Sequence, residues 1–173
     1  LELERDKEVL LGFDLGDGYD FSNVTSARVI LTIDPSVGST GWGKRGKHAK
    51  IHPLRRDFEE GNGINTGPES GQFRGTGAGA TWACSADQDI SNDKLDCSRR
   101  DRSQGARRRG KTVDRVRITN DLTGTVTFDV TRNVQNGLTQ WLIQVDGKKR
   151  GSIVFFSQEG AGQAPQLVIT TGG

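Results

Sequence analysis

Long apolar runs, histidines and known catalytic motifs are what this sequence lacks. No stretch approaches the ~18 apolar residues that a membrane-spanning helix needs, so we expect no membrane insertion. The only histidines are His48 and His52. Four residues of a strand span roughly 13 Å, so these two side chains could not share a metal ion unless the backbone turned back. No zinc-binding His-Glu motif and no Gly-x-Ser-x-Gly motif occurs. These absences predict a protein that is not an enzyme.

Cysteine is also scarce, and the two cysteines point to an oxidising compartment. Cys84 and Cys97 enclose a polar segment, whereas buried free thiols prefer apolar surroundings. We therefore predict a disulfide and an extracellular or cell-surface location. Two free thiols in a cytosolic protein remain the alternative. The chain starts at Leu1 without a signal peptide, which we interpret as a processed product.

Apolar residues recur with a period of two, which is typical of strands. Turn signals such as Gly16-Asp17-Gly18 and Asp146-Gly147 separate the runs. One short helix is expected, with Thr131 as its cap and Gly137 as its stop signal. Together these patterns predict an all-β fold, a jelly-roll-type antiparallel β-sandwich with one short helix, as a single domain over residues 1–173. The expected strand residues are Val9, Leu11 and Phe13; Ala27, Val29, Leu31 and Ile33; Ile51 and Leu54; Val113, Val116 and Ile118; Val126 and Phe128; Leu142 to Val145; Ile153 to Phe156; and Leu167 to Ile169. Residues 60–80 and 98–112 are expected to be loops.

A series of short segments resembles the DNRLRE-type domain of secreted bacterial and archaeal proteins. The segments are Leu10 to Leu15, Val24 to Val29, Ile51-His52, Arg56 to Gly61, Gly79 to Trp82, Phe128 to Thr131, Trp141 to Ile143, Phe156 to Glu159 and Ala164 to Val168. That family is similar to carbohydrate-binding modules attached to alginate-degrading enzymes. The chain departs from it in lacking the literal Asp-Asn-Arg-Leu-Arg-Glu string, in carrying Gln158 where the family has Arg, and in having only Leu1 to Glu8 where a first strand is usual.

Most of these residues are expected to support the fold. Four large side chains are predicted to be core: Phe13, Trp82, Phe128 and Leu142. Three acids beside turns are predicted to accept hydrogen bonds from backbone N–H groups: Asp14, Asp129 and Glu159. Pro165 suits the entry to an edge strand, because proline donates no ladder hydrogen bond. The resemblance therefore implies a fold and no active site.

Basic residues gather in two segments, although the net charge is only +2. Residues 42–56 contain six lysines and arginines and no acidic residue. Residues 99–117 contain nine lysines and arginines. Such clusters attract polyanions, and arginine suits planar carboxylates. Trp42 would stack on a sugar ring if exposed, or else it folds onto the sandwich. The candidate ligand-binding residues are Trp42, Lys44, Arg45, Lys47, His48, Lys50, His52, Arg107, Arg108 and Arg109.

An acidic segment between the cysteines is a candidate for Ca²⁺, which prefers six to eight oxygen ligands. It contributes Asp87, Asp89, Asp93 and Asp96, although the spacing is not that of an EF-hand. An exposed acidic loop is the alternative interpretation.

The sequence thus predicts a non-catalytic extracellular carbohydrate-binding module for an acidic polysaccharide, alginate or another uronan. The alternative is a structural or adhesive surface protein that self-associates into filaments by β-strand donation. A missing first strand would leave a sheet edge open for such donation. Leu1 to Val9 is the favoured donor, and Gln166 to Thr171 is a less favoured one, because the resemblance places it inside its own sheet. Nucleic acid is a weaker expectation, because the basic runs match no nucleic-acid-binding motif.

Overall fold

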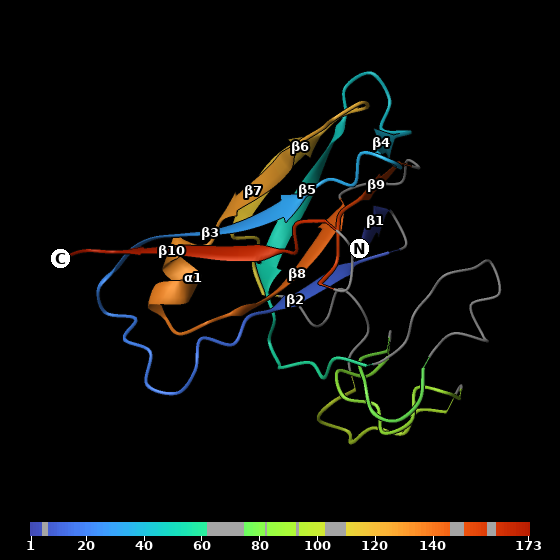
Figure 1. The fold of residues 1–173 in the computed structure, drawn as a ribbon. Coiled ribbons are helices and arrows are strands. Elements are labelled where there is room, and N and C mark those ends of the chain that lie inside the picture. Colours follow the sequence, from blue (N-terminus) through green and yellow to red (C-terminus); the bar gives the residue numbers. More distant parts are fainter. Residues whose placement is uncertain are drawn as a thin grey trace. The chain divides into compact units, whose positions relative to one another are not determined.

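Two compact units make up the chain in the computed structural model (Figure 1). The first comprises Leu1–Pro53 and Lys111–Gly173, and the second is Leu54–Gly110. The structure describes residues 1–4, 7–61, 75–81, 83–92, 94–102, 110–145, 151–158 and 162–173. The expectation that residues 1–173 form one domain stays a prediction.

The first unit is an all-β sandwich of antiparallel strands with one short helix, as predicted. Its described residues form three sheets, with strand orders β1-β9-β4, β10-β3-β7 and β2-β8-β5-β6. The elements are β1 (Glu2–Glu4), β2 (Val9–Gly12), β3 (Val24–Thr32), β4 (Ser39–Thr40), β5 (Lys47–Pro53), β6 (Asp114–Ile118), β7 (Thr125–Asp129), α1 (Thr131–Gln135), β8 (Gln140–Val145), β9 (Ser152–Val154) and β10 (Gln166–Thr171). In the part of the chain that is described, no helix is long and apolar enough to span a membrane.

The core of the first unit follows the alternation of the strands. Val29 and Leu31 of β3 are fully buried, as expected when one face of a strand packs inward. Phe128 and Leu142 are also fully buried, and Phe13 packs half-buried against Trp141, with ring centroids 6.2 Å apart. These placements confirm the predicted core residues, except Trp82, which lies outside the described residues.

Helix α1 begins differently from the prediction. Thr131 is its first helical residue, Val130 holds the cap position, and no side chain caps the helix. The Thr131 hydroxyl instead donates to the Asp129 carboxylate at 2.7 Å and accepts from the backbone N–H of Ala27 at 3.0 Å. The predicted cap is therefore wrong, because the hydroxyl ties the helix to β3 and β7. Gly137, with φ of 73°, confirms the predicted stop.

Carboxylates beside turns accept backbone hydrogen bonds, as expected. Asp14 accepts from the N–H of Gly16 at 2.8 Å, and Asp129 accepts from that of Thr131 at 2.9 Å. The Thr131 hydroxyl and backbone N–H together hold the pKa of Asp129 below its usual value. Glu159 lies outside the described residues. Pro165 directly precedes β10, an edge strand, in agreement with the prediction.

Asp114 joins the edges of two sheets. Its carboxylate accepts from the N–H of Arg115 at 2.7 Å and from that of Asp129 at 2.8 Å. Strands β6 and β7 are the outer strands of their sheets. The second bond therefore gives a partner to the Asp129 N–H, which no strand of its own sheet binds.

Replacing Asp114 by alanine should therefore lower the free energy of unfolding by about 1–2 kcal/mol, because two hydrogen bonds to a half-buried carboxylate are lost. Urea denaturation measures the change. Asp17→Ala is the control, because this exposed acid forms no bond among the described residues, and it should cost less than about 0.5 kcal/mol. Equal losses in the two variants would show that Asp114 does not join the sheets.

The N-terminal segment forms a strand within its own chain, which corrects the expected missing strand. β1 pairs with β9, from Glu2 opposite Val154 to Glu4 opposite Ser152, and Leu3 is fully buried. Ser152 also donates to Glu2 at 3.0 Å. Donation of this segment to another chain would require β1 to leave β9 and expose Leu3.

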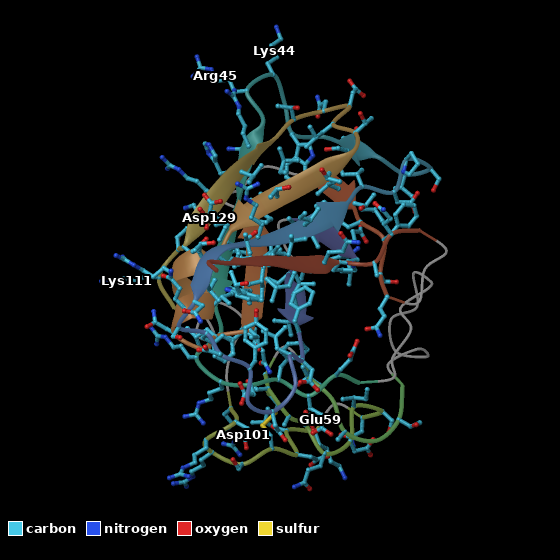
Figure 2. The ribbon with its side chains drawn as sticks, turned by 60° about the vertical axis from the view of Figure 1, so that its left-hand side comes forward. Lys44, Arg45, Glu59, Asp101, Lys111 and Asp129 are labelled. Atoms are coloured by element: carbon cyan, nitrogen blue, oxygen red, sulfur yellow. A yellow bond between two sulfur atoms is a disulfide. The ribbon has the colours of Figure 1, made fainter. Side chains whose placement is uncertain are left out.

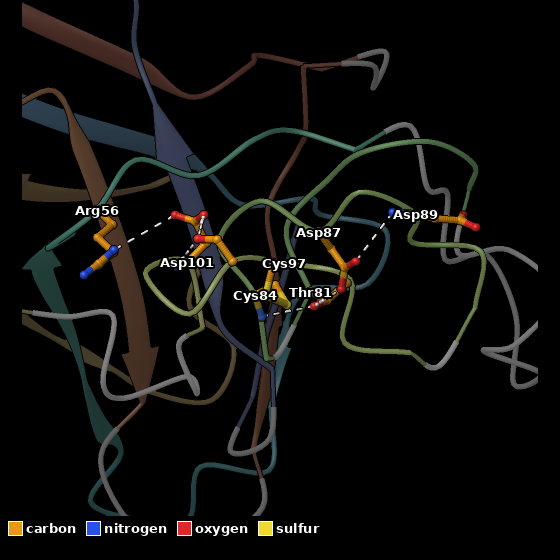
Figure 3. Close-up of a disulfide and its surroundings, with 8 residues drawn as sticks. Arg56, Thr81, Cys84, Asp87, Asp89, Cys97 and Asp101 are labelled. Carbon is orange, nitrogen blue, oxygen red and sulfur yellow. Dashed lines mark hydrogen bonds and ion pairs between the residues drawn. A yellow bond between two sulfur atoms is a disulfide. The ribbon is translucent and has the colours of Figure 1, made fainter.

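The second unit is built around the Cys84–Cys97 disulfide, which confirms the predicted pairing (Figure 3). Its described residues contain no regular strand or helix of their own. Isolated β-bridges connect its segments instead, such as the one between Gly79 and Asp87. Gly61 and Gly79 lie so close that a Cβ on Gly79 would come within 2.7 Å of the Gly61 Cα. The described parts of the predicted loops 60–80 and 98–112 likewise lie outside strands.

Candidate functional site

The antiparallel pairing of β5 with β6 brings the two basic segments of the sequence together. His48 lies opposite Arg117, and Lys50 lies opposite Arg115. Directly opposed residues share one face of a sheet, with Cβ atoms about 4.5–5.5 Å apart. Four basic or titratable side chains from segments some 65 residues apart thus form two adjacent cross-strand pairs.

The turn between β4 and β5 extends this cationic surface. Lys44 and Arg45 are exposed in this turn, and Figure 2 shows both side chains pointing outward from one end of the strands. The Arg117 guanidinium donates through Nε, at 2.8 Å, and through Nη2 to the backbone carbonyl of Arg45. Arg117 therefore fixes the turn to the β5–β6 ladder. We call Lys44, Arg45, His48, Lys50, Arg115 and Arg117 the basic face.

Gly46 allows this turn to lie close to β6. Its φ is +63°, in the left-handed region that favours glycine. A Cβ at this position would overlap the backbone carbonyl of Ile118 and lie 3.0 Å from the methyl group of Thr119. Glycine is thus required both by the backbone conformation and by the close packing.

Three cations of the basic face have no ion pair among the described residues. Lys44, Arg45 and Arg115 form no ion pair with a described acid. Asp114, the acid nearest in sequence to Arg115, is engaged by the two backbone N–H groups described above. These three side chains therefore carry positive charge that no described acid pairs.

Two predicted ligand residues are not available for binding. Trp42 is only 1% exposed, and its Nε1 donates to the Ser39 hydroxyl at 2.7 Å. The stacking prediction for Trp42 is wrong, and the alternative, a tryptophan folded onto the sandwich, is correct. His52 of β5 is fully buried, so it too is removed from the candidate site. Residues distant in sequence contribute to both corrections, because Gly151 packs against the Trp42 ring and Leu142 of β8 lies opposite His52.

The remaining predicted basic residues divide into two groups. Lys47 is half-buried and, by strand alternation, shares the face of Ala49 and Ile51, opposite to that of His48. Arg107, Arg108 and Arg109 lie outside the described residues, so their part in the site stays a prediction. Arg115 and Arg117 were not among the predicted site residues. The alternation of Val116 and Ile118 could have indicated them, because it places Arg115 and Arg117 together on the opposite, exposed face.

The structure describes three of the four predicted calcium ligands, so the calcium site stays a prediction. No group of three His, Cys, Asp or Glu residues that could hold a metal ion occurs among the described residues, and Asp93 lies outside them. Asp87 is 2% exposed and accepts from the Thr81 hydroxyl at 3.2 Å (Figure 3). Asn92 donates to both Asp89, at 2.9 Å, and Asp96, at 3.1 Å. The three described aspartates therefore accept hydrogen bonds from side chains of the same unit.

The local bonds of this acidic loop also affect its titration. The pKa of Asp89 is lowered by hydrogen bonds from the Ser91 hydroxyl, the Ser91 backbone N–H and the Asn92 amide. These donors stabilise the ionised carboxylate, and the positive charge of Lys94 makes a smaller contribution in the same direction.

No protein-family model matches the chain, and a search of curated proteins finds no match. The resemblance to the DNRLRE-type domain therefore stays a prediction.

Proposed function

We propose that this protein is a non-catalytic extracellular module that binds an acidic polysaccharide through the basic face. The observation that carries the proposal is the β5–β6 register, which sets His48 beside Arg117 and Lys50 beside Arg115. The disulfide is compatible with an oxidising, extracellular environment.

The arrangement suits a linear polymer of carboxylates. Successive cross-strand pairs on one face of a strand lie about 6.6–6.8 Å apart, and the exposed Lys44 and Arg45 lie beyond one end of this ladder. Arginine can bond both oxygens of a carboxylate. A uronan, which carries one carboxylate per sugar, offers a row of such groups.

Nucleic acid fits this face less well. Single-stranded nucleic acids are usually held by aromatic side chains that stack on the bases as well as by positive charge. None of the six residues of the basic face is a phenylalanine, tyrosine or tryptophan, and Trp42 is buried. Binding by charge alone favours a polymer recognised by its regularly spaced anions.

The double substitution Arg45→Ala with Arg115→Ala should weaken binding to alginate or polygalacturonate about tenfold. Each lost contact is expected to contribute roughly 0.7 kcal/mol, within the range of exposed ion pairs, and 1.4 kcal/mol corresponds to a factor of ten. Affinity electrophoresis or calorimetry measures the change. Raising the salt concentration should weaken binding of the parent protein, because exposed charges are screened.

The matched control is Arg28→Ala with Arg132→Ala. These two arginines are also exposed in the first unit, on β3 and α1, and neither belongs to the basic face. Equal weakening by the two double variants would indicate a non-specific charge effect and refute the site. Retention on neutral glucan at high salt, or a preference for single-stranded nucleic acid over uronan, would refute the proposed ligand class.

Filament formation by strand donation remains the alternative prediction. Its proposed donor, Leu1 to Val9, includes β1, which pairs with β9 of the same chain. No described feature of this segment favours donation, so the binding proposal is preferred.

A further inference from the structure

Strand β10 differs from the other edge strands in combining length with the absence of charge, and its one irregularity, between Thr170 and Thr171, lies at its C-terminal end. Natural edge strands are usually short, charged or interrupted, because their unpaired backbone groups can bind a further strand. Among the other outer strands, β1 and β6 carry charged residues, and β2 and β4 are short, with four and two residues. Strand β7 ends in Asp129, whose backbone N–H is bonded by Asp114.

Strand β10 has six residues, Gln-Leu-Val-Ile-Thr-Thr, with no charge and no proline. It pairs with β3 on one side, and no strand of the described residues pairs with it on the other (Figure 1). Val168, at its centre, is 45% exposed and is one of four large apolar side chains exposed in the described residues. A strand of this composition is a template for backbone pairing.

The sequence of β10 is complementary to itself. In a two-fold antiparallel pair centred on Val168, each Val168 lies opposite the other, Leu167 lies opposite Ile169, and Gln166 lies opposite Thr170. Apolar residues then meet apolar residues, and polar residues meet polar ones. No like charges oppose each other along the strand pair, so the fitting partner is a second copy of the same strand.

We propose that two copies of this protein associate through their β10 strands, joining the two β10-β3-β7 sheets into one six-stranded sheet about a two-fold axis at Val168. This assembly goes beyond polysaccharide binding and uses a different sheet from the basic face. The contact is isologous and occupies the free edge of both copies, so it ends at a dimer. Two basic faces on one dimer would increase retention on a polymer that both can reach.

The test is the assembly state of the full chain without polysaccharide, measured by sedimentation velocity over a range of concentrations. The parent protein should show a monomer–dimer equilibrium. Val168→Lys places two like charges opposite each other at the axis and should raise the dimer dissociation constant at least tenfold. Thr127→Lys adds the same charge to the exposed face of β7 in the same sheet, and it should leave the equilibrium unchanged. Circular dichroism melting verifies that both variants fold.

Cysteine cross-linking tests the register. In the proposed pair the two 168 positions lie directly opposite, within the Cα separation that a disulfide accepts, so Val168→Cys should yield a covalent dimer on oxidation. Gln166→Cys should not, because its copies lie about 13 Å apart along the strands. The proposal would be overturned by a parent chain that stays monomeric at millimolar concentration or that forms an unlimited ladder of assemblies. It would also be overturned if Thr127→Lys raised the dimer dissociation constant as much as Val168→Lys, or if cysteine cross-linked at position 166 and not at 168. None of these outcomes depends on polysaccharide binding.

Discussion

Replacing Trp42 by alanine should lower the free energy of unfolding of the first unit by about 3–5 kcal/mol, the usual cost of removing a large buried aromatic side chain. The indole is 1% exposed. Its Nε1 donates to Ser39, and its backbone N–H donates to the Asn120 side chain at 2.8 Å. Gly151 packs so tightly against the ring that a Cβ there would lie 2.6 Å from the indole Cδ2. Few atoms are free to fill the cavity that the substitution creates.

Guanidinium denaturation of the two proteins measures this loss. Trp42→Phe is the matched control, because it keeps an aromatic ring and removes only the N–H donor and part of the volume, so its cost should be smaller. Both variants, under conditions in which they are folded, should bind uronan like the parent. A Trp42→Ala variant as stable as the parent but weakened in binding would return Trp42 to the ligand site.

Removing the disulfide should destabilise the second unit by about 3 kcal/mol. Cys84 and Cys97 are 13 residues apart, and the chain-entropy model gives about 3 kcal/mol for a loop of this size. The described part of the unit has no regular strands to compensate. Apart from the two half-cystines, its buried apolar side chains are Leu54 and Ile90. The disulfide therefore accounts for a large share of what holds this unit folded.

Hydrogen exchange on the variant Cys84→Ser with Cys97→Ser measures the effect by region. Backbone N–H groups bonded within the second unit, such as those of Thr81, Ser85 and Asp87, should lose protection. Those of β3 should keep it, because the ladders of the first unit contain no cysteine. Protection of Ser85 and Asp87 equal to that in the parent would contradict the role assigned to the disulfide.

Local patterns in the sequence were sufficient to predict the long strands. The alternation in β3 and β7 and the glycine stop at Gly137 depend on neighbours within a few residues, and the structure confirms them. Strands of two or three residues, such as β1 and β4, are too short to show a period. Their pairing with β9 depends on residues more than 100 positions away.

The candidate site was predicted only in part for the same reason. The sequence identified the basic segments, but the strand register selects which of their side chains share a face. Lys47 and His48 are adjacent in sequence and lie on opposite faces of β5. Trp42 lies between two glycines, which suggested an exposed loop, yet its burial depends on Gly151, 109 positions later.

The anchor between Arg117 and the turn separates the shape of that turn from its chemistry. Arg117 holds the backbone carbonyl of Arg45, a group that every amino acid possesses, and not the side chain. Positions 44 and 45 are therefore free to exchange residues during evolution while the turn keeps its conformation. The charge and shape of these two side chains can therefore change without altering the backbone that presents them, and the same property makes the turn a suitable place to graft a new recognition sequence.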